Sequence, residues 1–184
     1  MDPITIKHLS IVKQCKNNSA KAQMQLYDLY CNAMFNVALR YVQNSQDAED
    51  VMQDAFVKVF KKLHMYHGEV SVGAWIKKIV INQSIDYLKK KSLNIVQLDA
   101  YENTIPVVDD NWDVAPEISK EQIVTSLYKL KEKYMIILSL YLFEGYDHKE
   151  ISEILSISEV SSRSQLHRGK KQLKILLKPY LYAK

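Results

Sequence analysis

Residues 147–173 read DHKEISEILSISEVSSRSQLHRGKKQL, and this stretch decides the fold of the C-terminal part of the chain. Ile151, Ile154 and Leu155 recur at helical spacing, which predicts a short helix with one apolar side. Residues 156–158 interrupt that spacing. The stretch therefore predicts two helices joined by a turn of about three residues.

The second helix is predicted to begin after Ser158, a residue type that caps helix N-termini well. Leu166 and Leu173 form its inner side, with Gly169 between them. The outer side is predicted to carry cationic and hydroxyl groups, namely those of Arg163, Ser164, His167, Arg168 and Lys171. This is the helix-turn-helix arrangement, whose second helix enters the major groove of DNA. The alternative is a helical hairpin whose basic side is only solvated.

Composition places the whole chain in the all-α class. Its 184 residues include only four Gly and four Pro, and they are enough for one or two domains. No stretch approaches the roughly 18 apolar residues of a membrane helix, so we expect a cytoplasmic protein. Cys15 and Cys31 have no CxxC or His partner at ligand spacing, so we expect reduced thiols, no metal and no cofactor.

Charge divides the chain into three parts. Residues 1–91 hold 13 basic and 8 acidic residues, a net charge of +5. Residues 92–119 hold six acidic residues and no Lys or Arg, together with Pro106 and Pro116. Residues 120–184 hold 12 basic and 7 acidic residues, again +5. The pattern predicts two small helical domains, 1–91 and 120–184, that bind polyanions and are joined by the acidic linker 92–119.

The first domain is predicted to contain four helices. A short helix lies within residues 1–19 and a longer one runs over residues 20–42. Asn44 or Ser45 caps a third, whose apolar side spans residues 48–63. A loop of about ten residues, 64–73, carries an aromatic residue and two His before a fourth helix starts at Ala74.

Two surfaces of this domain are candidates for binding. The third helix presents Asp50, Gln53 and Asp54 on its polar side. In the fourth helix, Lys78 and Asn82 lie four residues apart on the side that carries Trp75. An aromatic-bearing loop beside such a helix is suited to holding single-stranded bases. Trp75 itself is either a core residue or a base-stacking one.

In the C-terminal domain, apolar positions from Ile118 to Leu130 lead into an unbroken apolar run, residues 134–143. Gly145 is predicted to end the helix formed by this run. Pro179 is predicted to end the last helix.

These motifs resemble those of bacterial RNA polymerase sigma factors. Residues 47–60, DAEDVMQDAFVKVF, resemble the region 2 helix that binds core polymerase, and residues 73–82, GAWIKKIVIN, resemble the segment that follows it. Residues 150–158 and 163–168 resemble region 4. The order of the motifs and the linker between them are similar to those of the extracytoplasmic-function (ECF) subgroup, which keeps only regions 2 and 4.

The resemblance implies roles for particular residues. Asp50, Gln53 and Asp54 match positions that dock on the β′ clamp helices of core RNA polymerase. The positions that melt the −10 element and capture an unstacked base are matched by Tyr66, His67, Ser71, Lys78 and Asn82. Those that read the −35 element are matched by Arg163, Ser164, His167 and Arg168, with Lys171 on the same outer side. The resemblance also implies contact with the β flap and, commonly, inhibition by an anti-sigma factor that is often membrane-anchored.

Four departures from the region 4 pattern stand in the helix-turn-helix. Ser156 and Val160 replace glycines, Ser162 replaces an apolar residue that packs inward, and Gln165 replaces an arginine. Ser162 is expected to loosen the second helix. Gln165 puts a phosphate contact in doubt, and a Gln is able to read adenine instead.

The sequence thus predicts a promoter-specificity subunit that is monomeric alone, has no catalytic residue and acts with core polymerase on promoter DNA. One alternative is a stand-alone helix-turn-helix regulator that binds duplex DNA as a dimer. A third reading, a metal-dependent nuclease built on Asp50 and Asp54, lacks a His or a further carboxylate at ligand spacing.

Overall fold

In a computed structural model of the chain, which describes residues 3–93 and 118–182, the regular elements within these ranges are all helices. The all-α prediction is confirmed. The chain separates into two compact units, residues 1–97 and 98–184. The predicted linker lies almost wholly outside the described residues, so its boundaries and its role stay predictions; its first two residues continue a helix of the first unit.

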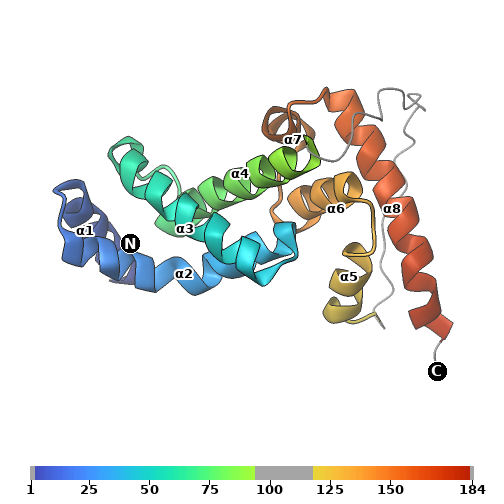
Figure 1. Ribbon diagram of the computed structural model, residues 1–184, viewed down its shortest axis with the longest axis horizontal. Coiled ribbons are helices and arrows are strands. Elements are labelled where there is room, and N and C mark those ends of the chain that lie inside the picture. The colour runs from blue at the N-terminus through green and yellow to red at the C-terminus, as the bar shows by residue number, and fades with distance from the viewer. Residues whose placement is uncertain (1–2, 94–117, 183–184) are drawn as a thin grey trace. The chain divides into compact units, whose positions relative to one another are not determined.

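The first unit contains four α-helices and one turn of 3-10 helix within its described residues (Figure 1). They are α1 (Pro3–Lys16), α2 (Ala20–Val42), α3 (Ser45–Lys62), η1 (Leu63–Met65) and α4 (Val72–Leu93). Two of the predicted starts are confirmed by their caps. The Ser19 hydroxyl accepts a hydrogen bond from the backbone N–H of Ala22 (3.3 Å), and the Asn44 side chain accepts one from that of Asp47 (3.0 Å).

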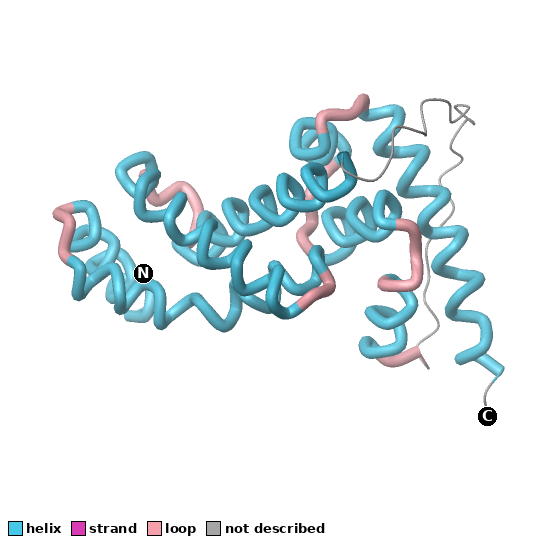
Figure 2. Tube along the Cα trace, viewed as in Figure 1, coloured by secondary structure: helices cyan, strands magenta, loops and turns pink. Residues whose placement is uncertain are grey.

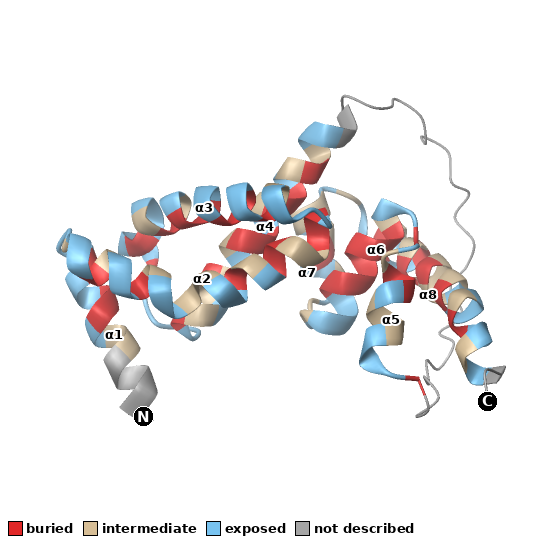
Figure 3. Cartoon of the chain, turned by 60° about the horizontal axis from the view of Figure 1, so that its bottom comes forward, coloured by how far each residue is buried: buried red, intermediate tan, exposed pale blue. Residues whose placement is uncertain are grey.

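The core of the first unit lies among α2, α3 and α4, which pack against one another, while α1 covers α2 and η1. The buried residues of these helices are coloured red in Figure 3. They include Leu26 and Tyr41 from α2, Val59 from α3, and Ile76 and Ile81 from α4. Full burial of a large aliphatic side chain such as Leu26 or Ile76 contributes about 1.5–3 kcal/mol to the free energy of folding. The polar sides of α3 and α4 are thereby left to solvent.

The second unit consists of α5 (Lys120–Leu127), α6 (Glu132–Leu138), the π-helix η2 (Ser139–Phe143), α7 (His148–Leu155) and α8 (Glu159–Tyr182). Short turns connect them (Figure 2). The predicted helix over the apolar run is confirmed, although its last turn widens into a π-helix. Gly145 has φ +76, a left-handed conformation that suits glycine, and it ends this helix as predicted.

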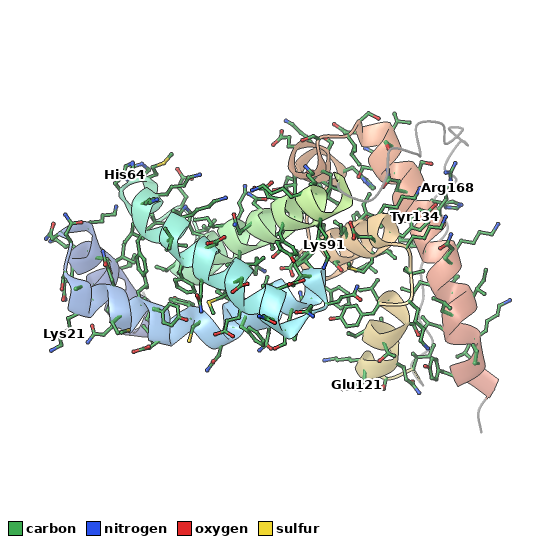
Figure 4. The ribbon with its side chains drawn as sticks, in the orientation of Figure 1. Lys21, His64, Lys91, Glu121, Tyr134 and Arg168 are labelled. Atoms are coloured by element: carbon green, nitrogen blue, oxygen red, sulfur yellow. The ribbon has the colours of Figure 1, made fainter. Side chains whose placement is uncertain are left out.

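In the second unit α8 packs against α5, α6 and α7. At Gly169 the helix lies close to α6, since an added Cβ would be 3.0 Å from Leu138 Cδ1 and 3.3 Å from the Cβ of Tyr134, which is labelled in Figure 4. A side chain at this position would push α8 away from α6. Leu166 and Leu173 flank the contact and are buried, as predicted for the inner side of the helix.

The prediction that Pro179 ends the last helix is wrong, because α8 continues through it to Tyr182. A proline inside a helix leaves the carbonyl group four residues earlier, here that of Ile175, without an N–H partner. Both residues are exposed, so water can hydrogen-bond to that carbonyl. Within the described ranges no helix is both long and apolar enough to cross a membrane.

Candidate nucleic-acid interface

The polar side of α3 presents Asp50, Gln53 and Asp54, and all three are exposed. Their spacing of three and four residues places them on one side of the helix. The amide nitrogen of Gln53 donates to the carboxylate of Glu49 (3.3 Å), and that of Gln83 in α4 donates to the carboxylate of Asp54 (3.3 Å). The result is an acidic, hydrogen-bonding surface on a rigid helix, in the predicted place.

Tyr66, expected to offer its ring to DNA, is instead part of the core, with 5% of its surface exposed. Its hydroxyl donates to the carbonyl oxygen of Val70 (2.7 Å), and its own carbonyl oxygen accepts from the ammonium group of Lys16 (2.7 Å). Burial also raises the pKa of its hydroxyl. The ring lies 5.4 Å from that of the half-buried Trp75. In this conformation Tyr66 holds the loop and has no free face for a base.

Ser71 also has a local role that the sequence analysis missed. Its hydroxyl accepts from the backbone N–H of Ala74 (3.2 Å), and its carbonyl accepts from that of Trp75 (3.0 Å). Ser71 therefore caps α4, which begins at Val72, two residues earlier than predicted. The remaining candidates of this surface, His67, Lys78 and Asn82, are exposed.

The turn of the helix-turn-helix is built on Ser156, which has φ 58 and ψ 46. This is the left-handed region, which explains why glycine is common there. Ser158 then caps α8 as predicted, because its hydroxyl accepts from the backbone N–H of Ser161 (3.1 Å). At the start of α7, Asp147 and Glu150 form a capping box.

The outer side of α8 carries most of the predicted DNA-reading residues. Arg163 and Lys171 are exposed, and His167 and Arg168 are half-buried; Figure 4 labels Arg168 on α8. The guanidinium group of Arg163 lies 3.4 Å from the carboxylate of Glu159. Ser164, however, is only 7% exposed, although helical spacing places it on the same side of α8 as His167 and Arg168.

A part-buried polar pair between α7 and α8 is a feature that the sequence did not reveal. Nδ1 of His148 lies 2.8 Å from the hydroxyl oxygen of Ser162, which is fully buried. The imidazole stacks on Tyr141 at 5.3 Å, and the ammonium group of Lys170 lies 5.4 Å above the same ring. Burial lowers the pKa of His148, and the charge of Arg163 lowers it further. Two features of the sequence could have indicated this pair. A His follows the N-cap of α7 directly, and position 162 carries a Ser where the family pattern has an apolar residue.

Gln165 is also engaged within the helix. Its amide nitrogen donates to the hydroxyl of Ser161 (3.0 Å), so neither the phosphate contact nor the reading of adenine is prepared in this conformation. Among the residues that the structure describes, no group of three His, Cys, Asp or Glu side chains is arranged to hold a metal ion.

Two family models match the chain in the expected order. The model of Sigma-70 region 2 matches residues 26–93, and that of Sigma-70 region 4 matches residues 120–173. The region 2 match contains α3, the loop and α4. The region 4 match contains α5 to α7 and the part of α8 that carries the basic outer side.

Curated relatives match over most of their own length. The chain is 26% identical over 158 residues to the ECF RNA polymerase sigma factor SigM of Bacillus subtilis (strain 168), covering 83% of this chain and 93% of SigM. It is 25% identical over 173 residues to SigW of the same organism, covering 89% and 92%.

Solved structures share the fold. One is the sigma factor RpoE in complex with the anti-sigma factor NepR from Bartonella quintana, with a TM-score of 0.54, 18% identity and coverage of 84% of this chain and 96% of that chain. Another is CnrH in complex with the cytosolic domain of CnrY, with a TM-score of 0.52, 19% identity and coverage of 92% and 96%.

Proposed function

The chain belongs to the ECF subgroup of bacterial RNA polymerase sigma factors, and we propose from this premise which of its surfaces bind polymerase and which bind promoter DNA. Sigma factors direct RNA polymerase to promoters. The observation that carries the proposal is that regions 2 and 4 occur in order, each with an exposed polar surface on a rigid helix. The stand-alone helix-turn-helix regulator is not favoured, because it leaves region 2 without a role.

Core polymerase binds the exposed side of α3. Asp50, Gln53 and Asp54 offer carboxylate and amide oxygens on one helix side, and such a surface complements the basic β′ clamp helices. The contact from Gln83 holds the carboxylate of Asp54 in place, which lowers the conformational entropy lost on binding. The β flap is the corresponding partner of the second unit.

The −10 element binds the loop after η1 and the adjoining part of α4. His67, Lys78 and Asn82 are exposed there and supply hydrogen bonds and positive charge to a single strand. Tyr66 and Ser71 support this surface from within, by closing the loop and by capping α4. We assign to both the role of positioning the loop and α4, and to His67, Lys78 and Asn82 the contacts with DNA.

The −35 element binds the outer side of α8. Arg163 and Arg168 offer guanidinium groups that suit guanine, while His167 and Lys171 add base or phosphate contacts. We leave Ser164 out of this set, because its side chain is only 7% exposed. The second unit therefore anchors the upstream duplex while the first unit stabilises the melted strand.

The chain contributes binding and no catalytic group, since RNA polymerase supplies the chemistry. Its place of action is then the cytoplasm, where bacterial promoters and polymerase are found. RpoE was captured with the anti-sigma factor NepR and CnrH with the cytosolic domain of CnrY, and we include a regulator of this kind, soluble or membrane-anchored, among the partners of this chain. We propose that the free chain is monomeric.

The test is to mix the purified chain with core polymerase and promoter fragments, then measure co-elution and run-off transcription. We expect a complex with core polymerase, initiation at specific sites, and weak binding of duplex DNA by the free chain. Tight duplex binding by a dimer without polymerase would support the stand-alone regulator. If the chain neither joins core polymerase nor directs initiation, the proposed function is wrong.

A further inference from the structure

Val160, the second residue of α8, has an exposed apolar side chain at the start of the recognition helix. Its side chain is 57% exposed, whereas Ser162 and Ser164 are only 0% and 7% exposed. Arg163 and His167 follow Val160 at three and seven residues, so the three lie along one side of the helix. Val160 thus extends the basic outer side toward the N-terminal end of α8.

Stability of the helix does not account for a valine here. Valine has a lower helix propensity than alanine, and the first turn favours acidic or small polar residues. The side chain is also too exposed to strengthen the core. What valine does provide is a rigid pair of methyl groups, because a β-branched side chain keeps one χ1 rotamer in a helix.

The N-terminal residues of a recognition helix are the ones that meet base edges in the major groove. Thymine is the base with an apolar group there, its C5-methyl. We infer that Val160 is a specificity-determining residue that packs against the C5-methyl group of a thymine in the −35 element. The inference rests on the proposed reading of this element by α8. Cytosine is disfavoured at that position, because its amino group is a hydrogen-bond donor and the valine side chain has no acceptor for it.

Arg163 determines where that thymine lies. Its guanidinium group is held near the N-terminal end of α8 by Glu159 (3.4 Å), and arginine reads guanine. Side chains three residues apart on a helix are about 5–6 Å apart, and neighbouring base pairs are about 3.4 Å apart. The thymine is therefore within about two base pairs of the guanine read by Arg163.

The test uses the full-length chain in complex with core polymerase. Preferred sites are first selected from random duplex DNA, and each thymine of the upstream element is then replaced by deoxyuridine, which lacks only the methyl group. We expect one replacement to weaken binding by the wild-type holoenzyme about threefold to fivefold, the effect of losing roughly one buried methyl group. Val160→Ser should bind both DNAs about equally.

Ile175→Ser is the matched control, since Ile175 lies on the same helix and is also 57% exposed. It should keep the wild-type sensitivity to deoxyuridine. If the wild-type holoenzyme selects a site but binds it equally well after every deoxyuridine replacement, the inference is wrong while the proposed function stands. The same conclusion follows if the Val160→Ser holoenzyme is as sensitive to deoxyuridine as the wild type. A chain that directs polymerase to no site overturns the proposed function and this inference with it.

Discussion

The imidazole Nδ1 of His148 and the hydroxyl oxygen of Ser162 lie 2.8 Å apart, and this hydrogen bond joins the two helices of the helix-turn-helix. His148 opens α7 and Ser162 lies in the first turn of α8. Contrary to the prediction that Ser162 loosens α8, its hydroxyl ties α8 to α7. A polar pair thus takes the place of the apolar contact that the family pattern has at this position.

Replacing Ser162 by Ala should destabilise the second unit by about 1–2 kcal/mol, because the part-buried imidazole loses its partner. Native-state hydrogen exchange of the α8 amides measures this loss locally. Thr125→Ala, an exposed change in α5 of the same unit, is the control and should alter exchange little. Unchanged exchange in Ser162→Ala would show that the hydrogen bond does not stabilise the motif.

Acidification should weaken the same contact. The pKa of His148 is lowered from its ordinary value of 6.5, first by burial and then by Arg163, against the opposing charges of Asp147 and Glu159. Between the lowered pKa and 6.5 the unfolded chain binds more protons than the folded one. This contribution to stability is therefore present in full above about pH 6.5 and decreases as the pH falls below it.

Denaturant unfolding near neutral and near mildly acidic pH measures this effect. The wild type should lose more stability on acidification than His148→Gln, which cannot be protonated in this range. Taking the difference between the two proteins removes the contribution of the other histidines. Equal losses would mean that His148 is as easily protonated in the folded protein as in the unfolded chain.

Ser156→Gly should stabilise the helix-turn-helix by about 0.5–1 kcal/mol, because a positive φ suits glycine better than serine. The measure is again exchange of the α7 and α8 amides. Ser152→Gly, inside α7, should have the opposite effect, a loss of about 1 kcal/mol. Loss of stability in Ser156→Gly would contradict the assigned turn geometry.

The double substitution Asp50→Lys with Asp54→Lys should weaken binding to core polymerase at least about tenfold, since it reverses the charge of the exposed side of α3. Both side chains are exposed, so thermal unfolding should change little. The control is Asp28→Lys with Glu69→Lys, an equal charge change at two exposed positions elsewhere in the first unit. Undiminished core binding by the α3 variant would remove these residues from the docking surface.

Arg163→Ala and Lys171→Ala should change promoter binding by the holoenzyme in different ways, the first affecting base selection and the second overall affinity. Loss of Arg163 should cost about 1–3 kcal/mol at the preferred site and relax selection at one base pair. Loss of Lys171 should weaken all duplexes alike and reduce the slope of log K against log salt by about one. The reverse pattern, with uniform loss for Arg163→Ala, would make Arg163 a phosphate contact.

The sequence alone determined where the helices lie, because the signals that start and stop them are local. Asn44 and Ser158 cap their helices with side chains that reach only three residues ahead, and Gly145 ends one through its own φ. The exposed acidic side of α3 also followed from helical spacing. Two helix limits differed from the prediction: α4 begins at Val72 instead of Ala74, and α8 continues through Pro179, whose exposed surroundings the sequence does not reveal.

Tertiary packing decided which polar side chains face solvent and which support the fold. Tyr66 and Ser164 stand in segments that looked exposed, yet both are buried. Ser162 was recognised as an inward position, but its partner His148 lies fourteen residues away. Burial depends on contacts with residues distant in the chain, so the spacing within one helix cannot determine it. For this reason the sequence predicted the helices that carry the proposed binding surfaces, and only the fold separated the exposed side chains on those surfaces from the buried ones.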